Sequence, residues 1–566
     1  MKRAAVILLG LLACAAAFVL LTLPPQAQAL ISMPGLPPTV RGVMHVHTER
    51  SDGSGTADDV AAAASRAGLR FVILTDHDTG AKEPGKPYYR FGVLMIEGVE
   101  ISTEQGHVIA LGLPRAPYPL AGEARDVLED IRRLGGISIA AHPESPKPEL
   151  RWSEWTTALD GLEWLNGDSE WRDESSVTLL GLLARYPFRQ PETLARLLDR
   201  PDPVMRRWDE LTQRRQVVAV AGADAHARIG LRSGEPDDTA LGVHLPSYEA
   251  MFRTFSISVQ PVTLNGDAVA DGRAVIEAIR RGHVYSSVDA LAAPAAMTFS
   301  ASGDRLPSSH MGEWVGSQGG ELEFVVETSA PDNARIVLFK NGDELTSAAG
   351  ATLRHTVGGG QGVYRAEVQL PGAPGEPPVP WMVSNPIYVG LNRTQPPAAG
   401  RPAATRVTPQ YENGPAAGWT VEASPRSKSA FEVTPGPGGT QLSLRWGLGG
   451  TVSEGPYVAL AMPAGPALSE SDRLLFTARA DRPTRVSVQL RSPNAGEGER
   501  WHRSVYLDEN ARDVTVFFDD MRPRGPTAQE RPNLATVSAV LFVIDTVNTS
   551  PGASGQIWID DVRLGR

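Results

Sequence analysis

The chain has 566 residues, a formal charge of −11, 56 glycines, 46 prolines and one cysteine, Cys14. At about 150 residues per domain this length predicts three or four domains, and a hydrophobic fraction of 42% excludes a disordered chain. An acidic chain without runs of lysine and arginine is not expected to bind nucleic acid, and a single cysteine near the N-terminus excludes disulfide scaffolds, thiolate metal sites and cysteine nucleophiles from the remainder.

The N-terminal segment, residues 1–29, is typical of a secretory signal peptide. Lys2 and Arg3 precede an apolar run over 4–23, and Ala27-Gln28-Ala29 follows as a small-x-small cleavage pattern. The apolar run is long enough to cross a bilayer, so an uncleaved membrane anchor stays open, as does a lipobox ending at Cys14. All three alternatives place the folded part outside the cytoplasm, in the periplasm or secreted, and a membrane contact is expected only if the segment is retained.

Between residues 40 and 291, short apolar strands alternate with helical segments. Strands are expected at 41–47, 69–75, 92–101, 107–113, 136–142, 159–166 and 217–223. Helices are expected at 58–67 and 123–134, each followed by a glycine. Residues 172–215 are expected to form a mainly helical insertion, which is a candidate lid or substrate wall. Alternation of this kind predicts a parallel, barrel-like α/β domain.

Two regions with strand patterns follow. Residues 296–392 alternate as in an immunoglobulin-like β-sandwich, with Asn341-Gly342 as a hairpin turn and Tyr364 as a corner tyrosine. A Pro/Ala-rich linker is expected at 394–409. Residues 410–566 alternate again and predict a jelly-roll β-sandwich.

Six of the 11 histidines lie before residue 243, and each is at or beside the end of a predicted strand: His45, His47, His77, His107, His142 and His226. Three carboxylates accompany them, Asp52 in a turn, Glu100 at a strand end and Asp224 two residues before His226. The carboxyl ends of parallel barrel strands converge on one face. These nine side chains therefore predict two or three divalent ions of Zn, Mn or Fe with a bridging water.

The order of these motifs resembles the PHP (polymerase and histidinol phosphatase) superfamily. The motifs are His45-Val46-His47-Thr48, Ser51-Asp52-Gly53, Thr75-Asp76-His77-Asp78, Gly98-Val99-Glu100-Ile101-Ser102 with Gly106-His107, Ala141-His142-Pro143, and Gly222-Ala223-Asp224-Ala225-His226. They span about 40–291. The step from Glu100 to Gly106-His107, together with the leader, resembles the branch that includes carbaryl hydrolase. The resemblance implies a distorted (βα)7 PHP-type barrel with a trinuclear metal site.

Carried over residue by residue, the resemblance implies three ion positions. The first would be bound by His45, His47, Glu100 and Asp224, the second by Glu100 as a bridge with His107 and His142, and the third by Asp52, His77 and His226. Some members have histidine at the position of Asp52, so two ions stay an alternative. Glu100, Asp224 and His142 are the residues expected to be catalytic.

The implied activity is that of a metal-dependent hydrolase with a small-molecule substrate. The first hypothesis is a phosphoesterase, the alternative is a carbamate or carboxylic ester hydrolase, and a nuclease or an inactive binding protein is less expected. A clamp of converging basic side chains would favour phosphoesters, with candidates Arg50, Lys82, Arg228 and Arg232. An apolar pocket would favour carbamates, with candidates Trp152, Trp155, Trp164 and Trp171. Asp76 and Asp78 are either acceptors that orient imidazoles or parts of a solvated turn.

The region after residue 410 resembles galactose-binding-like and carbohydrate-binding modules. The resemblance rests on Asp545-Thr546-Val547-Asn548 and on Gln556-Ile557-Trp558-Ile559-Asp560-Asp561-Val562. It implies an accessory role and a carbohydrate contact. Four tryptophans either pack in its core or form a sugar platform: Trp419, Trp446, Trp501 and Trp558.

Overall fold

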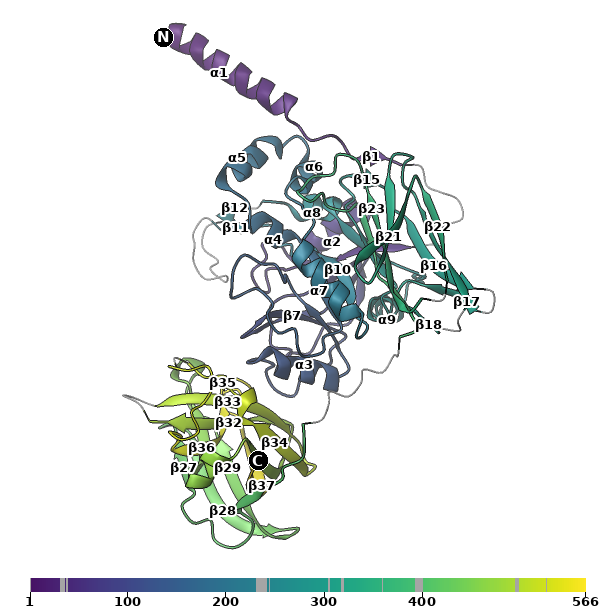
Figure 1. Cartoon of the computed structure of the whole chain (residues 1–566). Helices are drawn as coiled ribbons and strands as arrows, with labels where there is room; N and C mark the ends of the chain where they lie inside the picture. Colours follow the sequence, from purple (N-terminus) through teal and green to yellow (C-terminus); the bar gives the residue numbers. More distant parts are fainter. Residues whose placement is uncertain are drawn as a thin grey trace. The chain divides into compact units, whose positions relative to one another are not determined.

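The computed structural model of the chain describes residues 2–30, 36, 39–230, 242–243, 245–303, 306–316, 320–358, 360–391, 401–493, 498–525 and 527–566. The chain divides into two compact units (Figure 1). The first unit comprises Met1–Thr79, Glu83–Pro114 and Glu123–Pro396, and the second comprises Pro397–Arg566 with the short segments Gly80–Lys82 and Arg115–Gly122. Among the residues described, no helix combines the length and the apolar character needed to cross a membrane.

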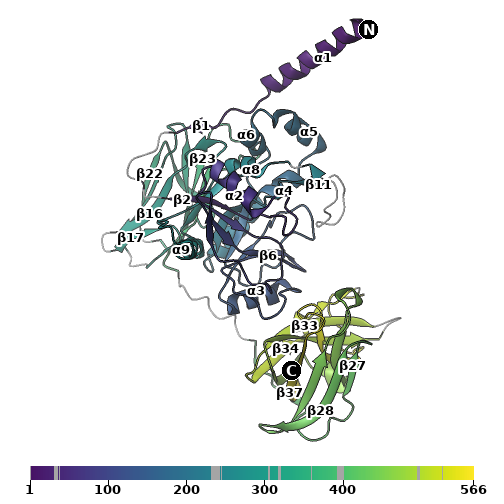
Figure 2. The same cartoon turned by 180° about the vertical axis from the view of Figure 1, so that it is seen from behind.

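The α-helices of the described residues lie in the first unit. They are α1 (Lys2–Leu21), α2 (Ala57–Arg66), α3 (Ala124–Arg133), α4 (Gly167–Arg172), α5 (Ser176–Arg185), α6 (Gln190–Ala195), α7 (Asp202–Thr212), α8 (Tyr248–Thr254) and α9 (Ala268–Arg280). The expected helical insertion is therefore present as α5 to α7. Helices α2 and α3 match the expected helices, and no helix was expected at α4, α8 or α9. In both views α4, α5, α6 and α8 lie together at one end of this unit (Figures 1 and 2).

A five-stranded sheet has the order β10-β9-β8-β7-β6. Its strands are β6 (Val99–Thr103), β7 (Gly106–Leu111), β8 (Ile137–Ala140), β9 (Gly161–Asn166) and β10 (Val218–Gly222). The pairs β8–β9 and β9–β10 are parallel as expected, but β6–β7 and β7–β8 are antiparallel. Two residues join β6 to β7, and a parallel pair needs a crossover of about a dozen residues. The expected all-parallel arrangement is therefore wrong for this hairpin.

A 12-stranded sheet has the main path β18-β25-β23-β24-β14-β13-β2-β3-β5-β4, with β20 and β21 off it. Its α/β part consists of β2 (Val40–Met44), β3 (Phe71–Leu74), β4 (Tyr88–Arg90), β5 (Val93–Glu97), β13 (Ser256–Val259) and β14 (Val284–Ser287). Strand β14 pairs with β24 (Met382–Ser384). The α/β region and the following β region therefore share one sheet.

Two isolated bridges join the two sheets at the ends of their strands. Val46 pairs with Ala225, and His77 pairs with Glu100. The backbone N–H of His47 donates to Ala225 O at 3.1 Å, and the N–H of Ala225 donates to His45 O at 3.2 Å. The closure of the sheets therefore lies at the predicted ligands.

The β region of the first unit is built around a shared apolar core that includes Phe299, Phe324 and Trp381. Further strands of the large sheet are β18 (Trp314–Val315), β20 (Arg335–Lys340), β21 (Asp343–Ala349), β23 (Gly362–Gln369) and β25 (Ile387–Val389). A second sheet has the order β17-β16-β19-β22, made of β16 (Met297–Gly303), β17 (Leu306–His310), β19 (Glu321–Thr328) and β22 (Thr352–Gly358). Asn341 and Gly342 have φ of 55° and 94° and form the expected turn between β20 and β21. The Tyr364 hydroxyl donates to Gly360 O at 3.1 Å, as a corner tyrosine does.

Two short strand pairs complete the first unit. β1 (Gln28–Ala29) pairs in parallel with β15 (Ala292–Ala293), and β11 (Ile229–Gly230) pairs with β12 (Gly242–Val243). Strand β1 therefore consists of the last two residues of Ala27-Gln28-Ala29, the small-residue pattern expected to be a cleavage site.

The second unit contains two six-stranded sheets. One has the order β28-β29-β37-β31-β34 with β26 on β37, and the other has the order β27-β30-β36-β32-β33-β35. The first consists of β26 (Val407–Tyr411), β28 (Lys428–Gly436), β29 (Gly439–Gly447), β31 (Arg473–Ala480), β34 (Arg512–Phe517) and β37 (Ser554–Gly565). The second consists of β27 (Thr420–Ala423), β30 (Tyr457–Pro463), β32 (Thr484–Ser492), β33 (Glu499–Leu507), β35 (Arg522–Pro523) and β36 (Ala539–Asp545). Strand β26 begins inside the range expected to be linker, of which residues 392–400 lie outside the described residues.

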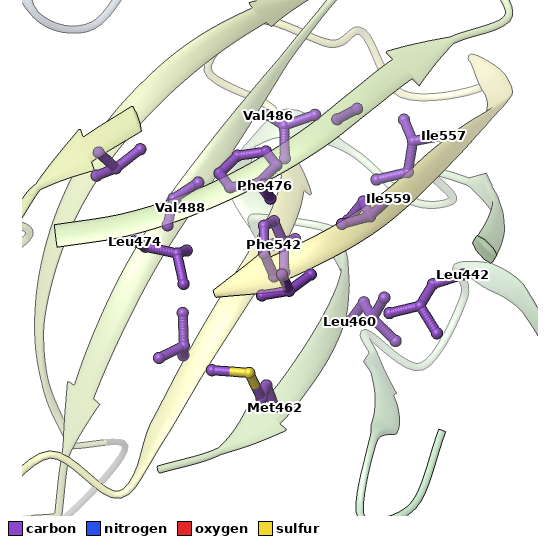
Figure 3. Packing of buried hydrophobic residues seen from close by; sticks show 14 of the residues in the cluster. Leu442, Leu460, Met462, Leu474, Phe476, Val486, Val488, Phe542, Ile557 and Ile559 are labelled. Atoms are coloured by element: carbon purple, nitrogen blue, oxygen red, sulfur yellow. The ribbon is translucent and has the colours of Figure 1, made fainter. Parts of the chain in front are cut away.

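The larger apolar cluster of the second unit forms its main core, part of which Figure 3 shows, and a smaller cluster consists of Ala459, Ala461, Ala539, Leu541 and Val543. Phe476 and Phe542 meet edge to face at 5.1 Å between ring centroids. Trp419, Trp446 and Trp501 are buried in the larger cluster, so core packing explains these three tryptophans. Trp558 is half-buried, and the Arg479 guanidinium lies 3.6 Å from its ring centroid.

Candidate metal centre

The structure brings all nine predicted ligands together at the ends of strands in the first unit. Four groups have ligand atoms within 4.8 Å of one another: His45, His47 and Asp224; His45, Glu100 and His142; His77, Glu100 and His107; and His47, Asp52, His77 and His226. The groups share members, so the nine side chains form one continuous cluster. Most of them are buried, and the side chains of Asp52, His77 and His226 are the more accessible ones.

Glu100 lies at the centre of this cluster and uses both carboxylate oxygens. Its Oε2 is 3.2 Å from His45 Nε2 and 3.2 Å from His47 Nε2. Its Oε1 is 2.9 Å from His107 Nδ1 and 2.9 Å from His142 Nε2. A carboxylate that faces two pairs of imidazoles has the geometry expected of a bridging ligand.

Two further carboxylates complete the cluster on either side of Glu100. Asp224 Oδ1 lies 3.3 Å from His45 Nε2 and 3.5 Å from His47 Nε2. Asp52 Oδ2 lies 3.1 Å from His226 Nε2 and 3.6 Å from His77 Nε2. Each predicted ion position therefore has at least one carboxylate beside its imidazoles.

Three of the imidazoles are held at Nδ1, so that Nε2 faces the carboxylates. His45 Nδ1 donates to Glu163 Oε1 at 2.7 Å, His142 Nδ1 donates to Leu150 O at 3.0 Å, and His226 Nδ1 donates to Asp224 O at 3.0 Å. Histidines that bind metal ions usually donate their other ring N–H to a carboxylate or a carbonyl in this way. The tautomer with an Nε2 lone pair directed at the centre is thereby favoured for all three.

Glu163 contacts the candidate ligands and was not predicted from the sequence. It is fully buried on β9, and it accepts hydrogen bonds from His45 Nδ1, from the His142 backbone N–H at 2.8 Å and from Asn166 Nδ2 at 2.8 Å. Asn166 also donates to Asp224 Oδ2 at 3.1 Å. The available signal was an acid and an amide within the otherwise apolar strand Gly161–Asn166, since buried polar side chains require partners.

The carboxylates favour positive charge on the imidazoles. Burial lowers the pKa of His77, but Glu100 and Asp52 raise it to about 9. Burial likewise lowers the pKa of His226, but Asp52 and Asp224 raise it to about 10. Burial raises the pKa of Glu100, but His45, His77 and His107 hold it well below its ordinary value. The cluster is therefore a place where the protein stabilises added positive charge.

The donor atoms fit a group of divalent ions. His47 Nε2 and His77 Nδ1 are buried and make no hydrogen bond, although buried polar atoms are almost always paired. A cation that accepts their lone pairs would satisfy both atoms. Nitrogen and carboxylate donors without thiolate suit Zn, Mn or Fe.

A cavity of about 420 Å³ lies beside the centre, with Asp224 and His226 among its lining residues. Trp171 and leucines of the helical insertion line it, and Lys147, Arg172 and Arg228 lie in the same lining. Part of the helical insertion thus forms a wall of this cavity, as expected.

The other candidates from the sequence have different surroundings. Arg50 pairs with Asp76 at 3.1 Å and with Glu97 at 2.7 Å. Asp76 accepts hydrogen bonds from the Thr48 backbone N–H and the Ser51 hydroxyl, so it holds the loop after β2. The Asp78 carboxylate accepts from the Thr79 N–H. Lys82 belongs to a segment of the second unit, and Arg232 lies outside the described residues.

The tryptophans expected to line a pocket separate into two groups. Trp152 and Trp164 are buried, and Trp155 is partly buried with the Arg207 guanidinium 5.7 Å from its ring centroid. Of the four, only Trp171 appears in the cavity lining.

No protein-family model matches the chain. The chain is 32% identical over 137 residues to the uncharacterized protein MJ1587 of Methanocaldococcus jannaschii, a match that covers 22% of this chain and 80% of that protein. It is 34% identical over 97 residues to phosphoribosyl 1,2-cyclic phosphate 1,2-diphosphodiesterase of Eggerthella lenta, covering 15% of this chain and 36% of that protein. It is 32% identical over 108 residues to 3',5'-nucleoside bisphosphate phosphatase of Chromobacterium violaceum, covering 17% of this chain and 38% of that protein. The chain thus matches just over a third of the length of each of these two enzymes.

Two solved structures are similar to parts of the chain. A two-domain protein of Bacteroides vulgatus, described as containing a predicted PHP-like metal-dependent phosphoesterase, has a TM-score of 0.31 and 14% identity over 64% of this chain and 99% of that one. The family 11 carbohydrate-binding module of cellulase Lic26A-Cel5E of Clostridium thermocellum has a TM-score of 0.25 and 16% identity over 29% of this chain and 97% of that one. At these scores neither likeness defines the fold. The two enzymes named above support the expected PHP-superfamily hydrolase, and the 32% identity over four-fifths of MJ1587 places the chain in the same family as that protein.

Proposed function

We propose that the chain is a metal-dependent phosphoesterase of the PHP type that acts on a small-molecule phosphoester. The observation that carries this proposal is the continuous cluster of six imidazoles and three carboxylates, with Glu100 between two pairs of histidines. The similarity to a phosphodiesterase and a phosphatase supports phosphoesters as the substrate class.

The nine ligands would hold two or three Zn, Mn or Fe ions, which supply a water of lowered pKa and neutralise charge on phosphate oxygens. The chain's own residues orient the site. Glu163 fixes the ring of His45 through Nδ1 and holds the backbone of His142. Lys147, Arg172 and Arg228 lie in the lining of the adjacent cavity, and their cationic side chains would bind phosphate oxygens.

A carbamate or carboxylic ester hydrolase with the same ligands is the second candidate. The observation that favours it is the apolar part of the cavity, with Trp171 and leucines of the helical insertion. Membership of the carbaryl-hydrolase-like branch would go with this alternative. Both functions use the same centre, so the substrate decides between them.

We further propose that the protein is extracytoplasmic and that its last domain is accessory. Lys2 and Arg3 before an apolar segment, with the small-residue pattern at 27–29, support export. The β-sandwich of the second unit would contact carbohydrate or present a large substrate. We also propose that residues 40–291 form a distorted (βα)7 barrel, residues 296–392 an immunoglobulin-like sandwich and residues 410–566 a jelly roll.

The test compares full-length protein with two variants on a panel of a phosphomonoester, a phosphodiester and an aryl carbamate. We expect metal-dependent phosphoester hydrolysis that Glu100→Gln abolishes, together with loss of bound metal measured by elemental analysis. His355→Ala, on β22 and outside the cluster, should leave both unchanged. Hydrolysis of the carbamate alone would support the second candidate and overturn the first, and equal losses in both variants would show that the chemistry lies elsewhere.

A further inference from the structure

We propose that the cavity beside the metal centre binds the apolar organic group of the substrate, so that the substrate class is a phosphoester of an apolar alcohol. This inference rests on the proposed phosphoesterase function and adds the specificity of the same site.

The cavity is placed to receive the group attached to a phosphate at the centre. Asp224 and His226, which belong to two different groups of the cluster, are both in its lining. A phosphate held at the cluster would therefore have its ester oxygen at one end of the cavity. A volume of about 420 Å³ lies within the range of about 300–1,000 Å³ found for pockets that bind organic ligands.

Part of the cavity wall is apolar. Leu179 comes from α5, Leu194 from α6, Leu197 and Leu198 from the segment after it, and Met251 from α8. Leu194, Leu197 and Leu198 are buried, so this wall is packed and preformed. A sugar or a nucleobase would leave its polar groups without partners against such a wall, which costs affinity, whereas an alkyl or aryl group gains affinity there.

The polar part of the lining suits an anion. Lys147 has no ion pair among the residues that the structure describes, and Arg172 pairs with Asp168 on the same helix. Burial raises the pKa of Glu170 well above its ordinary value, so this carboxyl adds less negative charge to the wall than its type implies. The cavity thus combines cationic side chains with an apolar wall.

The experiment measures binding of methylphosphonate and n-hexylphosphonate to the metal-loaded full-length protein by titration calorimetry. Phosphonates are not hydrolysed as esters, so the readout is independent of turnover. Each fully buried methylene is worth about a fourfold gain in affinity. We therefore expect the hexyl compound to bind at least about thirtyfold more tightly, since its five additional methylenes would be only partly buried.

Two neighbouring leucines of α5 provide a matched pair of variants. Leu179 lines the cavity and is half-buried, whereas Leu180 is 70% exposed and is absent from the lining. Leu179→Asn should remove most of the gain from the hexyl chain and leave methylphosphonate binding unchanged. Leu180→Asn should leave both affinities unchanged.

Equal affinities of the two phosphonates in the unmodified protein would overturn this assignment even if every variant failed to fold. Equal effects of Leu179→Asn and Leu180→Asn would also overturn it, because the hexyl group would then not depend on the side chain that lines the cavity. Neither result affects the phosphoesterase proposal, which depends on the hydrolysis panel and on Glu100→Gln.

Discussion

Three of the predicted ligands have left-handed backbone conformations, which side chains with a Cβ rarely adopt. The φ angles are 62° at His45, 31° at His142 and 48° at Asp224. Each such residue costs about 1–3 kcal/mol and persists only when its surroundings fix it. The Glu163 carboxylate holds the His142 N–H, and the N–H of Ala225, the residue after Asp224, donates to His45 O. The strain therefore lies where the two sheets close around the cluster.

Glu163→Gln tests whether the buried carboxylate behind the ligands sets metal affinity. Glu163 accepts on both oxygens, so the amide nitrogen of glutamine would face an N–H donor in either orientation. Loss of such a partner typically lowers metal affinity about 10- to 100-fold. We expect this loss in metal titrations, with secondary structure retained. Glu277 is a partly exposed residue of α9 paired with Arg281, and the control variant Glu277→Gln should bind metal normally. Unchanged affinity in Glu163→Gln would mean that the carboxylate only stabilises the fold.

The convergence of the nine candidate ligands could be predicted because each lies in a local motif at or beside a strand end. Glu163 was missed, because its sequence signal is a polar residue inside a buried strand and no spacing rule links it to His45. The left-handed φ angles are equally invisible in the sequence, since histidine and aspartate at these positions carry no conformational signal of the kind that glycine does.

Strand β10 depends on glycine at its last position. A Cβ on Gly222 would lie 1.7 Å from Glu163 Oε1, and that carboxylate is held by three hydrogen bonds. We predict that Gly222→Ala displaces the Glu163 carboxylate, lowers stability by about 1–3 kcal/mol and weakens metal binding about tenfold or more. Gly358→Ala at the end of β22 meets no atom within 4 Å and is the control. If thermal unfolding and metal titration shift equally in both variants, the close contact has no consequence.

At the element scale, α2 and α3 were predictable because their signals are local, whereas α8 and α9 were not predicted. Thr56 and Asp59 form a capping box at the start of α2, and Gly68 and Gly135 have φ of 73° and 82° after α2 and α3. Strand pairing was less predictable. The expected strand 92–101 is two strands, β5 and β6, that belong to different sheets on either side of Gly98. The position at which one strand ends and the next begins depends on the neighbouring strands, which are distant in sequence.

A buried ion pair fixes helix α7 to strand β23. The Arg365 guanidinium donates to Asp209 at 2.7 and 2.8 Å and also pairs with Glu367, which Arg200 contacts at 2.8 Å. Arg365→Met should destabilise the first unit by about 3–5 kcal/mol in chemical unfolding, because it leaves Asp209 without its buried partner. Arg354→Met, an exposed residue of β22, should cost much less. Adding Asp209→Leu to Arg365→Met should recover stability. If Arg365→Met costs no more stability than Arg354→Met, the ion pair does not fix α7 to β23.

At the scale of the whole molecule, the change from α/β to β pattern near residue 296 was visible in the sequence, but the pairing across it was not. Strand β14 pairs with β13 on one side and with β24 on the other, so one sheet crosses the expected boundary. Tyr285 on β14 belongs to the core of the β region. A pairing between residues about 100 positions apart leaves no periodic signal in either segment. We therefore expect the α/β region and residues 296–392 to unfold together.

We expect metal to stabilise the first unit and not the second. All donor clusters found in the described parts of the chain lie between His45 and His226, and the core cluster of the second unit extends from Tyr411 to Leu564. A ligand that binds only the folded state stabilises it by an amount that grows with its free concentration relative to its dissociation constant. In calorimetry of the full chain, removal of metal by a chelator should lower the melting temperature of one transition by about 5 °C or more and leave the other unchanged.

A chain shortened to end at Thr394 should keep the metal-sensitive transition and hydrolyse a small soluble phosphoester. The piece 402–566 should keep the insensitive transition. If both transitions shift on chelation, or if the shortened chain binds metal normally but is inactive, then the last domain completes the active site and is not accessory.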